Sequence, residues 1–293
     1  MSNARLGRIA VLTAITFWSA GNLIVRGTEL TGPQIAFWRY LLASIAYAIG
    51  HRIWVGPLRW SDFKTAAPVG ITLALEIAAF FVAIKDTSVA NATIIGALTP
   101  LLLFGVAARR FSERISLRLI VTTIIALFGV AAVVFGADGS IGWNPRGDTL
   151  AVVALIFFAM YFALGKVARE TLSGITLQTH SLLAGTPVLF IVFFLDSGGI
   201  PLPDGGQWFY VFGLIALPST GHFLIGWAHE HVSLTLLSLM TLGVPVLSVI
   251  GARVLYDETL TAAQVIGIVA VLAVLSFAIV ETARIEAEDT ATT

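Results

Sequence analysis

Residues 88–135 read SVANATIIGALTPLLLFGVAARRFSERISLRLIVTTIIALFGVAAVVF, and much of their pattern returns in residues 233–280, SLTLLSLMTLGVPVLSVIGARVLYDETLTAAQVIGIVAVLAVLSFAIV. The landmarks that recur 145 positions later are Ser88 at Ser233, Pro100 at Pro245, Phe111 at Tyr256, Glu113 at Glu258 and Ser116 at Thr261. Each copy contains an apolar run with one proline, a short charged turn and a second apolar run. The repetition predicts a helical hairpin that occurs twice, around which the other segments can be placed.

The bulk composition indicates that lipid is the solvent for most of this chain. Apolar residues make up 57% of the sequence, charged residues make up 12%, and the mean hydropathy is +0.92. Soluble domains carry about 25% charged residues, so this chain could not cover a soluble surface. The net charge of zero gives no reason to expect a nucleic-acid partner. Because the sequence contains no Cys, disulfides, thiolate catalysis and cysteine metal sites are excluded.

Ten apolar runs, each near the ~20 residues that cross a bilayer core, predict an all-α integral membrane protein. They are approximately residues 9–25, 34–50, 65–84, 88–107, 117–136, 148–168, 177–195, 208–227, 232–255 and 262–280. The connections between them are short and leave no room for a soluble domain. We therefore divide the chain into a first five-helix repeat at residues 1–140, a second at residues 141–282, and a charged, disordered cytoplasmic tail at residues 283–293.

The distribution of positive charge predicts the orientation of the chain. If the N-terminus is inside, twelve Lys and Arg residues fall on the inner side and four on the outer side, while Arg39 lies within a span. This excess predicts that both termini are cytoplasmic, in a multi-pass protein of the cytoplasmic (cell inner) membrane. Because each repeat has an odd number of spans, the second copy must run upside down relative to the first. Inverted repeats of this kind are found in secondary transporters, which bind substrate near the midplane.

Several short motifs resemble those of the drug/metabolite transporter superfamily, and of its EamA-type exporters in particular. The matching residues are Phe17-Trp18-Ser19 with Asn22, Arg39, Pro100 with Glu113, Pro245, and Glu258-Thr259-Leu260-Thr261 with Gln264 and Gly267. The first copy departs from this pattern, since Glu113-Arg114-Ile115-Ser116 lacks the following Gln and Gly. The resemblance covers nearly the whole chain and implies efflux of amino acids, related metabolites or drugs. It also implies a central cavity lined mainly by spans 1, 3, 4, 6, 8 and 9.

Glu76, in the middle of the third predicted span, is the first candidate for the substrate site. A carboxylate at this depth is costly unless it is paired, protonated or facing water, which makes it a functional candidate. Arg39 in the second span lies at a comparable depth from the same predicted membrane boundary. Two alternatives remain open: the two charges form a structural ion pair, or Glu76 faces the cavity and binds an ammonium group or a proton.

Other candidates combine aromatic rings with polar groups. Trp18 and Asn22 are four residues apart and share a helical face, as do Phe157 and Tyr161, and both pairs suit a partly apolar solute. His222 is a candidate for coupling transport to protons, because a histidine side chain ordinarily titrates near neutral pH, and a neutral, hydrogen-bonded ring is the alternative. The remaining candidate binding residues are Phe80, Asn91 and Thr241. Aromatic packing and hydrogen bonds between helices are the structural alternatives for this set.

Two prolines are candidate hinges. Pro100 and Pro245 occupy equivalent positions in the two copies, and each removes a backbone hydrogen bond within an apolar run. We expect both helices to be kinked there, so that bending could open one gate and close the other. Small residues in the fifth and tenth spans suit close packing, so we expect a scaffold role, with a homodimer contact as an additional use of this surface.

The sequence shows no motif for a cofactor, a metal or a nucleotide. His229, Glu230 and His231 do not have the spacing of a zinc motif on a helix, and there is no phosphate-binding GxxxxGK[ST] loop. We therefore predict a secondary transporter without a cofactor, driven by a gradient of protons or of substrate. Its expected partners are the lipid bilayer and a small-molecule substrate, with amino acids as first choice and multidrug or organic-cation efflux as the alternative. An intramembrane enzyme and a channel are the rivals from other functional classes.

Overall fold

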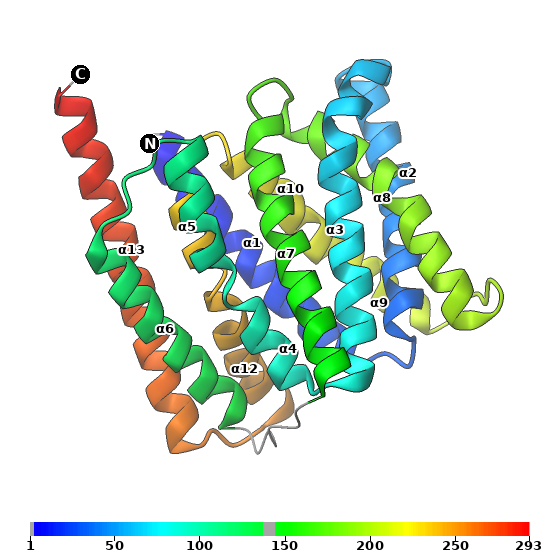
Figure 1. The fold of residues 1–293 in the computed structure, drawn as a ribbon. Coiled ribbons are helices and arrows are strands. Elements are labelled where there is room, and N and C mark those ends of the chain that lie inside the picture. The colour runs from blue at the N-terminus through cyan, green and yellow to red at the C-terminus, as the bar shows by residue number, and fades with distance from the viewer. Residues whose placement is uncertain (1–2, 137–143, 293) are drawn as a thin grey trace.

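The computed structural model describes residues 3–136 and 144–292, and in this part of the chain all regular structure is helical (Figure 1). In chain order the elements are α1 (Asn3–Arg26), α2 (Gly32–Trp54), α3 (Trp60–Asp86), α4 (Val89–Gly96), α5 (Thr99–Arg110), α6 (Leu117–Phe135), α7 (Pro145–Ala168), α8 (Gly174–Ser197), α9 (Gln207–Leu214), the π-helical segment η1 (Ile215–Ser219), α10 (Thr220–Ala228), α11 (Leu234–Met240), α12 (Gly243–Tyr256) and α13 (Ala262–Thr292). The predicted boundary between the repeats, at residues 140 and 141, lies outside the described residues.

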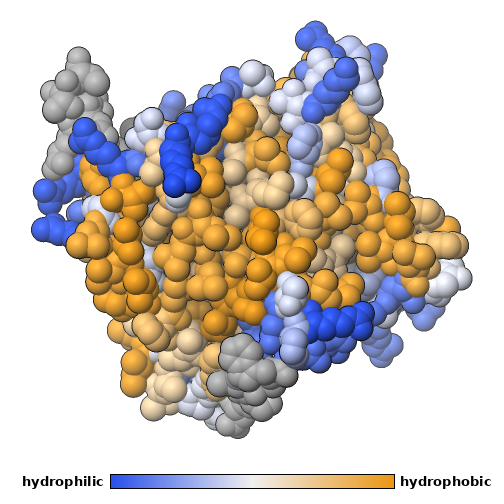
Figure 2. Space-filling model, viewed as in Figure 1, coloured by the Kyte–Doolittle hydropathy of each residue, from blue (hydrophilic) through white to orange (hydrophobic). Residues whose placement is uncertain are grey.

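Ten helical stretches of membrane length arise within the described ranges, because α4–α5, α9–η1–α10 and α11–α12 each form one span. Nine of them are apolar enough to cross a membrane by length and composition. The tenth, α2, has 23 residues but contains the polar side chains of Gln34, Arg39, His51 and Arg52. Figure 2 shows a broad apolar belt between hydrophilic margins, as expected for a surface in contact with lipid. The predicted all-α membrane fold is thus confirmed.

The spans connect two faces of the molecule, a terminal face and an opposite face. The terminal face is the one that carries both chain ends in Figure 1, together with the turns at residues 55–59, 111–116, 169–173 and 229–233. The opposite face carries the turns at residues 27–31, 87–88, 198–206 and 257–261. Successive spans alternate in direction between these faces.

The inverted repeat is visible in the way that equivalent helices begin. Ser88 Oγ accepts the backbone N–H of Asn91 at 3.0 Å, and Ser233 Oγ accepts that of Leu236 at 3.4 Å. In the following helix of each repeat, the hydroxyls of Ser116 and Thr261 accept the N–H three residues further on, both at 3.2 Å. Such capping side chains supply partners to N–H groups that the first turn leaves free. The shared local sequence therefore sets the same helix starts on both faces.

The two prolines lie next to interruptions in their helices. Each of these spans consists of two helices, with the interruptions at residues 97–98 and 241–242. Pro100 and Pro245 lie in the first turn of α5 and of α12, where the missing N–H would have no partner within the helix. Residues 97, 98, 241 and 242 keep right-handed helical backbone angles, so each span is interrupted only locally at the place where the sequence predicts a kink. Proline is better accommodated at such a helix start than in a helix interior.

Helices from the two repeats are interleaved. α3 packs against α7 and α8, α1 packs against α10 and α12, and α6 packs against α13. Gly129 on α6 and Gly267 on α13 face each other, since a Cβ added to Gly129 would lie 3.1 Å from the carbonyl oxygen of Gly267. These small residues of the fifth and tenth spans therefore join two helices of one chain, which is the expected scaffold role.

The end of the chain differs from the sequence prediction. Residues 283–293 were expected to form a disordered tail, whereas α13 continues as a helix to Thr292. The physical reason is composition, because residues 283–288 are Ala, Arg, Ile, Glu, Ala and Glu, most of which favour helix, and no Gly or Pro interrupts the segment.

Candidate functional site

The main cavity lies in the half of the spans nearer the opposite face and has a volume of about 210 Å³. Its wall is formed by Trp18, Glu76, Phe80, Ala92, Thr93, Gly96, Ala97, Ala151, Ala154, Leu155, Phe158, Thr241, Leu242, Val244 and Pro245. These residues come from α1, α3, α4, α7 and the α11–α12 span, so both repeats contribute. The interruptions of the two broken spans reach the wall through Ala97, Thr241 and Leu242. A mostly apolar wall with few polar groups is the usual character of a small-molecule site.

Glu76 lies on this wall without a salt bridge to Arg39. No ion pair within 4.0 Å joins the two side chains in the described part of the chain. Arg39 Nε is buried without a hydrogen-bond partner, and its guanidinium lies 5.3 Å from the ring centre of Tyr40. The charges of Arg39 and Glu76 are close enough to interact through space. The arrangement leaves the carboxylate facing the cavity rather than bound to its predicted partner.

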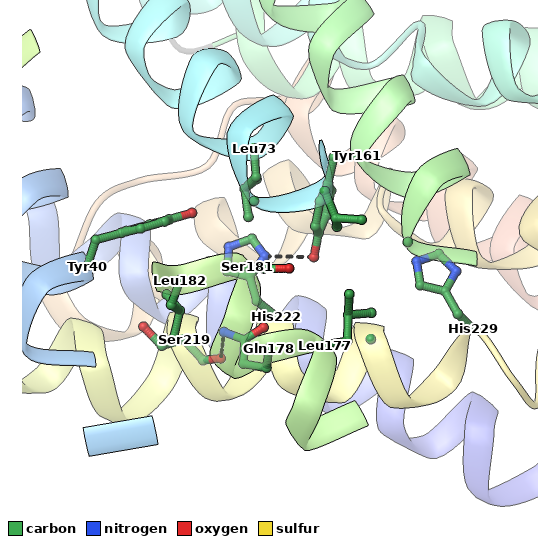
Figure 3. A pocket seen from close by; sticks show the side chains of 14 residues that line it. Tyr40, Leu73, Tyr161, Leu177, Gln178, Ser181, Leu182, Ser219, His222 and His229 are labelled. Atoms are coloured by element: carbon green, nitrogen blue, oxygen red, sulfur yellow. Dashed lines mark hydrogen bonds between the residues drawn. The ribbon is translucent and has the colours of Figure 1, made fainter. Parts of the chain in front are cut away.

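A second, smaller cavity lies in the half of the spans nearer the terminal face, and Figure 3 shows its wall. Its volume is about 20 Å³, which is room for about one water molecule. Tyr161 and His222 point toward each other across it, with 3.2 Å between the hydroxyl and Nδ1. The His222 ring also lies 4.8 Å from that of Trp18, which borders the main cavity. His222 and Trp18 therefore connect the walls of the two cavities.

The structure sorts the candidate residues into three groups. Trp18, Glu76, Phe80, Thr241 and Pro245 border the main cavity. Tyr161 and His222 border the smaller one. Neither wall includes Asn22, Arg39, Asn91, Phe157 or Pro100.

The residues outside both cavities have identifiable surroundings. Asn22 donates to the hydroxyl of Ser248 at 3.1 Å, a bond that joins α1 to α12. Asn91 is buried in the first turn of α4, where its side chain lies 3.4 Å from the hydroxyl of Thr87. Both amides thus make hydrogen bonds within or between helices, which is the structural alternative that the sequence left open.

One aromatic residue was misplaced by a single position. The sequence pairs Phe157 with Tyr161, but Phe158 borders the main cavity and stacks on Tyr161 with 6.0 Å between ring centres. One residue corresponds to about 100° around an α-helix, enough to move a side chain to another face. Ala92, Thr93 and Gly96 also border the main cavity and are absent from the candidates predicted from the sequence, although the spacing of small residues on α4 was a signal for them.

A π-helical segment shapes the smaller cavity. Pro218 lies inside η1, where it cannot donate a backbone hydrogen bond, and Ser219 beside it borders the cavity. Gln178 Nε2 donates to the carbonyl oxygen of Ser219 at 3.5 Å. Single π-helical turns often occur at functional sites, because they shift the side chains that follow. In this chain Ser219, at the end of η1, and His222, three residues later, both border the smaller cavity.

The two histidines of the turn after α10 lie apart from each other. The His229 ring packs 5.8 Å from that of Phe162 on α7, whereas the His231 ring packs 4.2 Å from that of Trp227. His229 is buried, and neither of its ring nitrogens has a hydrogen-bond partner among the described residues. Burial lowers the pKa of His229 to about 3, and the nearby charges of Lys166 and Arg169 act in the same direction.

This environment predicts acid sensitivity. Between pH 6.5, the approximate pKa in the unfolded chain, and pH 3, the unfolded state binds more protons at His229 than the folded state does. The unfolding free energy should therefore fall as the pH falls through this window, by at most about 1.4 kcal/mol per pH unit. The melting temperature in detergent should drop less between pH 7 and pH 5 for His229→Asn than for the unaltered chain. An equal drop would show that His229 does not carry the effect.

Comparisons with known proteins agree with this architecture. The EamA-like transporter family matches the chain twice, at residues 5–135 and 145–280, which correspond to the two repeats. A curated relative from Archaeoglobus fulgidus, described as an uncharacterized transporter, is 25% identical over 276 residues, covering 88% of this chain and 93% of the relative. A solved crystal structure with 19% sequence identity shares the fold with a TM-score of 0.80, covering 96% of this chain and 99% of the other. The chain is therefore a multi-pass membrane protein that belongs to the EamA-like transporter family.

Proposed function

We propose that this protein is a secondary active transporter that exports small amphipathic metabolites, most notably amino acids or related compounds, by alternating access. The observation that carries the proposal is the Glu76 carboxylate on a wall otherwise rich in aromatic and aliphatic side chains. A solute with an ammonium group could meet the carboxylate while its apolar part contacts Trp18, Phe80 and Phe158. The volume of about 210 Å³ favours a small solute, since sites for drug-sized ligands start at roughly 300 Å³.

The alternative is efflux of organic cations or of several drugs. It is favoured by the same carboxylate, because Glu76 is the acidic residue on the main cavity wall and no basic residue borders it in the described ranges. The zwitterion of an amino acid also needs a partner for its carboxylate. Arg39, the cation that the sequence suggests for this role, borders neither cavity in this conformation, so an amino acid would bind in this way only if the site rearranges to expose Arg39. We take a proton as the candidate coupling ion, because Glu76 and the Tyr161–His222 pair supply titratable groups.

Counterflow in liposomes tests the proposal. Liposomes that contain the purified protein and an unlabelled solute should take up the same radiolabelled solute transiently, because a carrier exchanges solute across the membrane. The panel should contain amino acids, simple amines and quaternary ammonium compounds, so that the two substrate classes are separated. Uptake without stimulation by solute on the far side would indicate a channel, and chemical change of the solute would indicate an enzyme.

We further propose that the terminal face is cytoplasmic and that the protein resides in the cell (inner) membrane. Support comes from the excess of Lys and Arg in the turns on that face. Because the chain has no Cys, single cysteines at Arg110 and Glu258 can report the orientation, and both side chains are exposed. In intact cells, an impermeant thiol reagent should label position 258 and leave position 110 unlabelled until the cells are opened. The reverse pattern would contradict the orientation.

A further inference from the structure

The turn between α5 and α6 places a carboxylate at the start of a span from the other repeat. Glu113 Oε1 accepts the backbone N–H of Leu234 at 2.7 Å, and Oε2 accepts the backbone N–H and the hydroxyl of Thr235 at 2.9 and 2.7 Å. The first N–H groups of a helical span lack partners within the helix and favour negative charge. Glu113 therefore ties the start of the span at residues 234–256 to the first repeat at the terminal face.

A lysine completes this contact. Lys166 Nζ lies 3.6 Å from Glu113 Oε1, donates to the carbonyl oxygen of Val232 at 3.0 Å, and lies 5.4 Å from the ring centre of Phe111. The side chains of Lys166 and Glu113 are only 18% and 13% exposed. The contact is thus a closed one that joins α7, the turn before α6 and the start of α11.

The same turn recurs, inverted, at the opposite face. In the described residues, the non-glycine residues with positive φ are Ser112 at 54° and Asp257 at 52°, and they are 145 positions apart. Ser112 directly precedes Glu113, and Asp257 directly precedes Glu258. A left-handed backbone conformation at the equivalent position therefore orients the glutamate in both turns. At the opposite face, Arg26 pairs with Glu258 and lies 4.8 Å from the ring centre of Tyr256. A carboxylate, a cation and a ring thus recur as a set.

The backbone contacts that accompany this set at the terminal face are missing at the opposite face. The residues equivalent to Leu234 and Thr235 are Val89 and Ala90, and no hydrogen bond joins Glu258 to either of them in the described ranges. Arg26 and Glu258 are 53% and 44% exposed. α11 packs against α5, but the equivalent elements α4 and α12 border the main cavity, which lies in this half of the molecule. The contact between Glu258 and the start of α4 is therefore not formed in the half of the molecule that contains the main cavity.

We propose that Glu113 and Glu258 are paired gate residues that act alternately. Glu113 seals the terminal face in the conformation seen here, and Glu258 makes the equivalent backbone contacts with Val89 and Ala90 when the cavity closes at the opposite face. The inference rests on the proposed alternating-access transport, for which it supplies the contacts that define each closed gate. The broken spans provide the moving parts, since the α4 and α11 segments can tilt at residues 97–98 and 241–242.

The two seals are not equal. Thr235 contributes a hydroxyl to Glu113, whereas its equivalent Ala90 has none. The opposite-face seal therefore has one hydrogen bond to a carboxylate fewer, which favours the conformation seen here. Ala90→Thr should supply the equivalent hydrogen bond from position 90 to Glu258. It should thereby raise the population of the conformation that is closed at the opposite face by about tenfold.

Cysteine labelling tests the proposal without a known substrate. The reporters are Thr93→Cys, on the main cavity wall, and Ser238→Cys, which is its equivalent in the second repeat and is fully buried. Each is made in the full-length, otherwise Cys-free chain, in lipid nanodiscs that expose both faces to a small thiol reagent. In the unaltered background, position 93 should react quickly and position 238 slowly.

The two gate variants should act in opposite directions. Glu113→Gln weakens the terminal-face seal, so labelling at position 238 should rise by about tenfold and labelling at position 93 should fall. Glu258→Gln weakens only the other seal, so labelling at position 238 should fall by about the same factor. General destabilisation would instead raise labelling at both positions. The matched control is Glu170→Gln, which removes a half-exposed carboxylate on the same face and should leave both rates unchanged.

Several outcomes would overturn the gate assignment. One is an unchanged rate at position 238 in folded Glu113→Gln, and another is a change of the same sign in both gate variants. If Glu113→Gln does not fold, Ala90→Thr decides, because it touches no contact of the seal seen here: faster labelling at position 238 supports the proposal, and an unchanged rate contradicts it. If the protein shows counterflow of solutes but the gate variants leave the labelling rates at positions 93 and 238 unaltered, the gate assignment is refuted and the transport proposal stands. Opposite labelling shifts without any counterflow would refute the transport proposal and retain the gate.

Discussion

Replacing Glu76 with glutamine is expected to reduce counterflow of amine-bearing solutes by at least tenfold while leaving the amount of folded protein unchanged. The carboxylate faces the main cavity and makes no salt bridge within the described residues. Glutamine has nearly the same shape, but it loses the charge-assisted bond to an ammonium group, which is worth roughly 1.5–3 kcal/mol. Counterflow of neutral solutes should persist, which separates loss of substrate binding from loss of folding. Glu170→Gln, at a half-exposed surface position, is the control and should transport normally.

The double variant Arg39→Gln with Glu76→Gln decides between the two roles considered for Glu76. If the pair were structural, removing both charges would relieve the cost of an unpaired charge, roughly 3–5 kcal/mol for a buried pair, and would restore transport. Because the side chains do not touch in this structure, the double variant is expected to fold and to remain inactive. Full transport by the double variant, with an unaltered pH dependence, would remove Glu76 from the substrate site.

Replacing Gly70 with alanine is expected to abolish most of the folded protein. Gly70 lies where α3 crosses α8, and an added Cβ would lie 2.6 Å from the Cα and carbonyl carbon of Ser181, and closer still to its carbonyl oxygen. The obstructing atoms belong to the backbone, so the helices themselves must separate. Overpacking usually costs about 1–3 kcal/mol, and an immobile backbone puts this site at the upper end or beyond. The separation would also break the 3.3 Å bond from the Ser181 hydroxyl to the carbonyl oxygen of Ala66.

Gly105 on α5 provides a matched control for this substitution. It also lies within a helix, but nothing is within 4 Å of the position that its Cβ would occupy. Gly105→Ala should therefore be neutral or slightly stabilising, because alanine favours helix over glycine by up to about 1 kcal/mol. Yield of monodisperse protein and melting temperature in detergent measure both variants. Equal behaviour of the two would show that the α3–α8 crossing does not limit folding.

The sequence alone was sufficient to predict the lipid environment, the membrane-spanning helices and the repeat symmetry of this protein. Its small share of charged residues indicates a lipid environment, and its apolar runs coincide with the helices. The repeated landmarks at Ser88 and Ser233, and at Ser116 and Thr261, became the capping residues of equivalent helices. These features depend on local chemistry, namely hydropathy over about twenty residues and hydrogen bonding within the first turn. They can therefore be predicted without knowing which helices are neighbours.

Only the tertiary structure decided which face of each helix meets the cavity. In water, an apolar stripe marks the buried face of a helix, but lipid is as apolar as the protein interior, so both faces of a membrane helix look alike in sequence. For that reason the sequence selected Phe157 where the cavity has Phe158, and it left open whether Glu76 pairs with Arg39 or faces the cavity. The contact between Glu113 and Thr235 was equally out of reach, although both residues lie within the repeated segments. It depends on how the two repeats approach each other, and that approach is set by close backbone crossings such as Gly70 on Ser181.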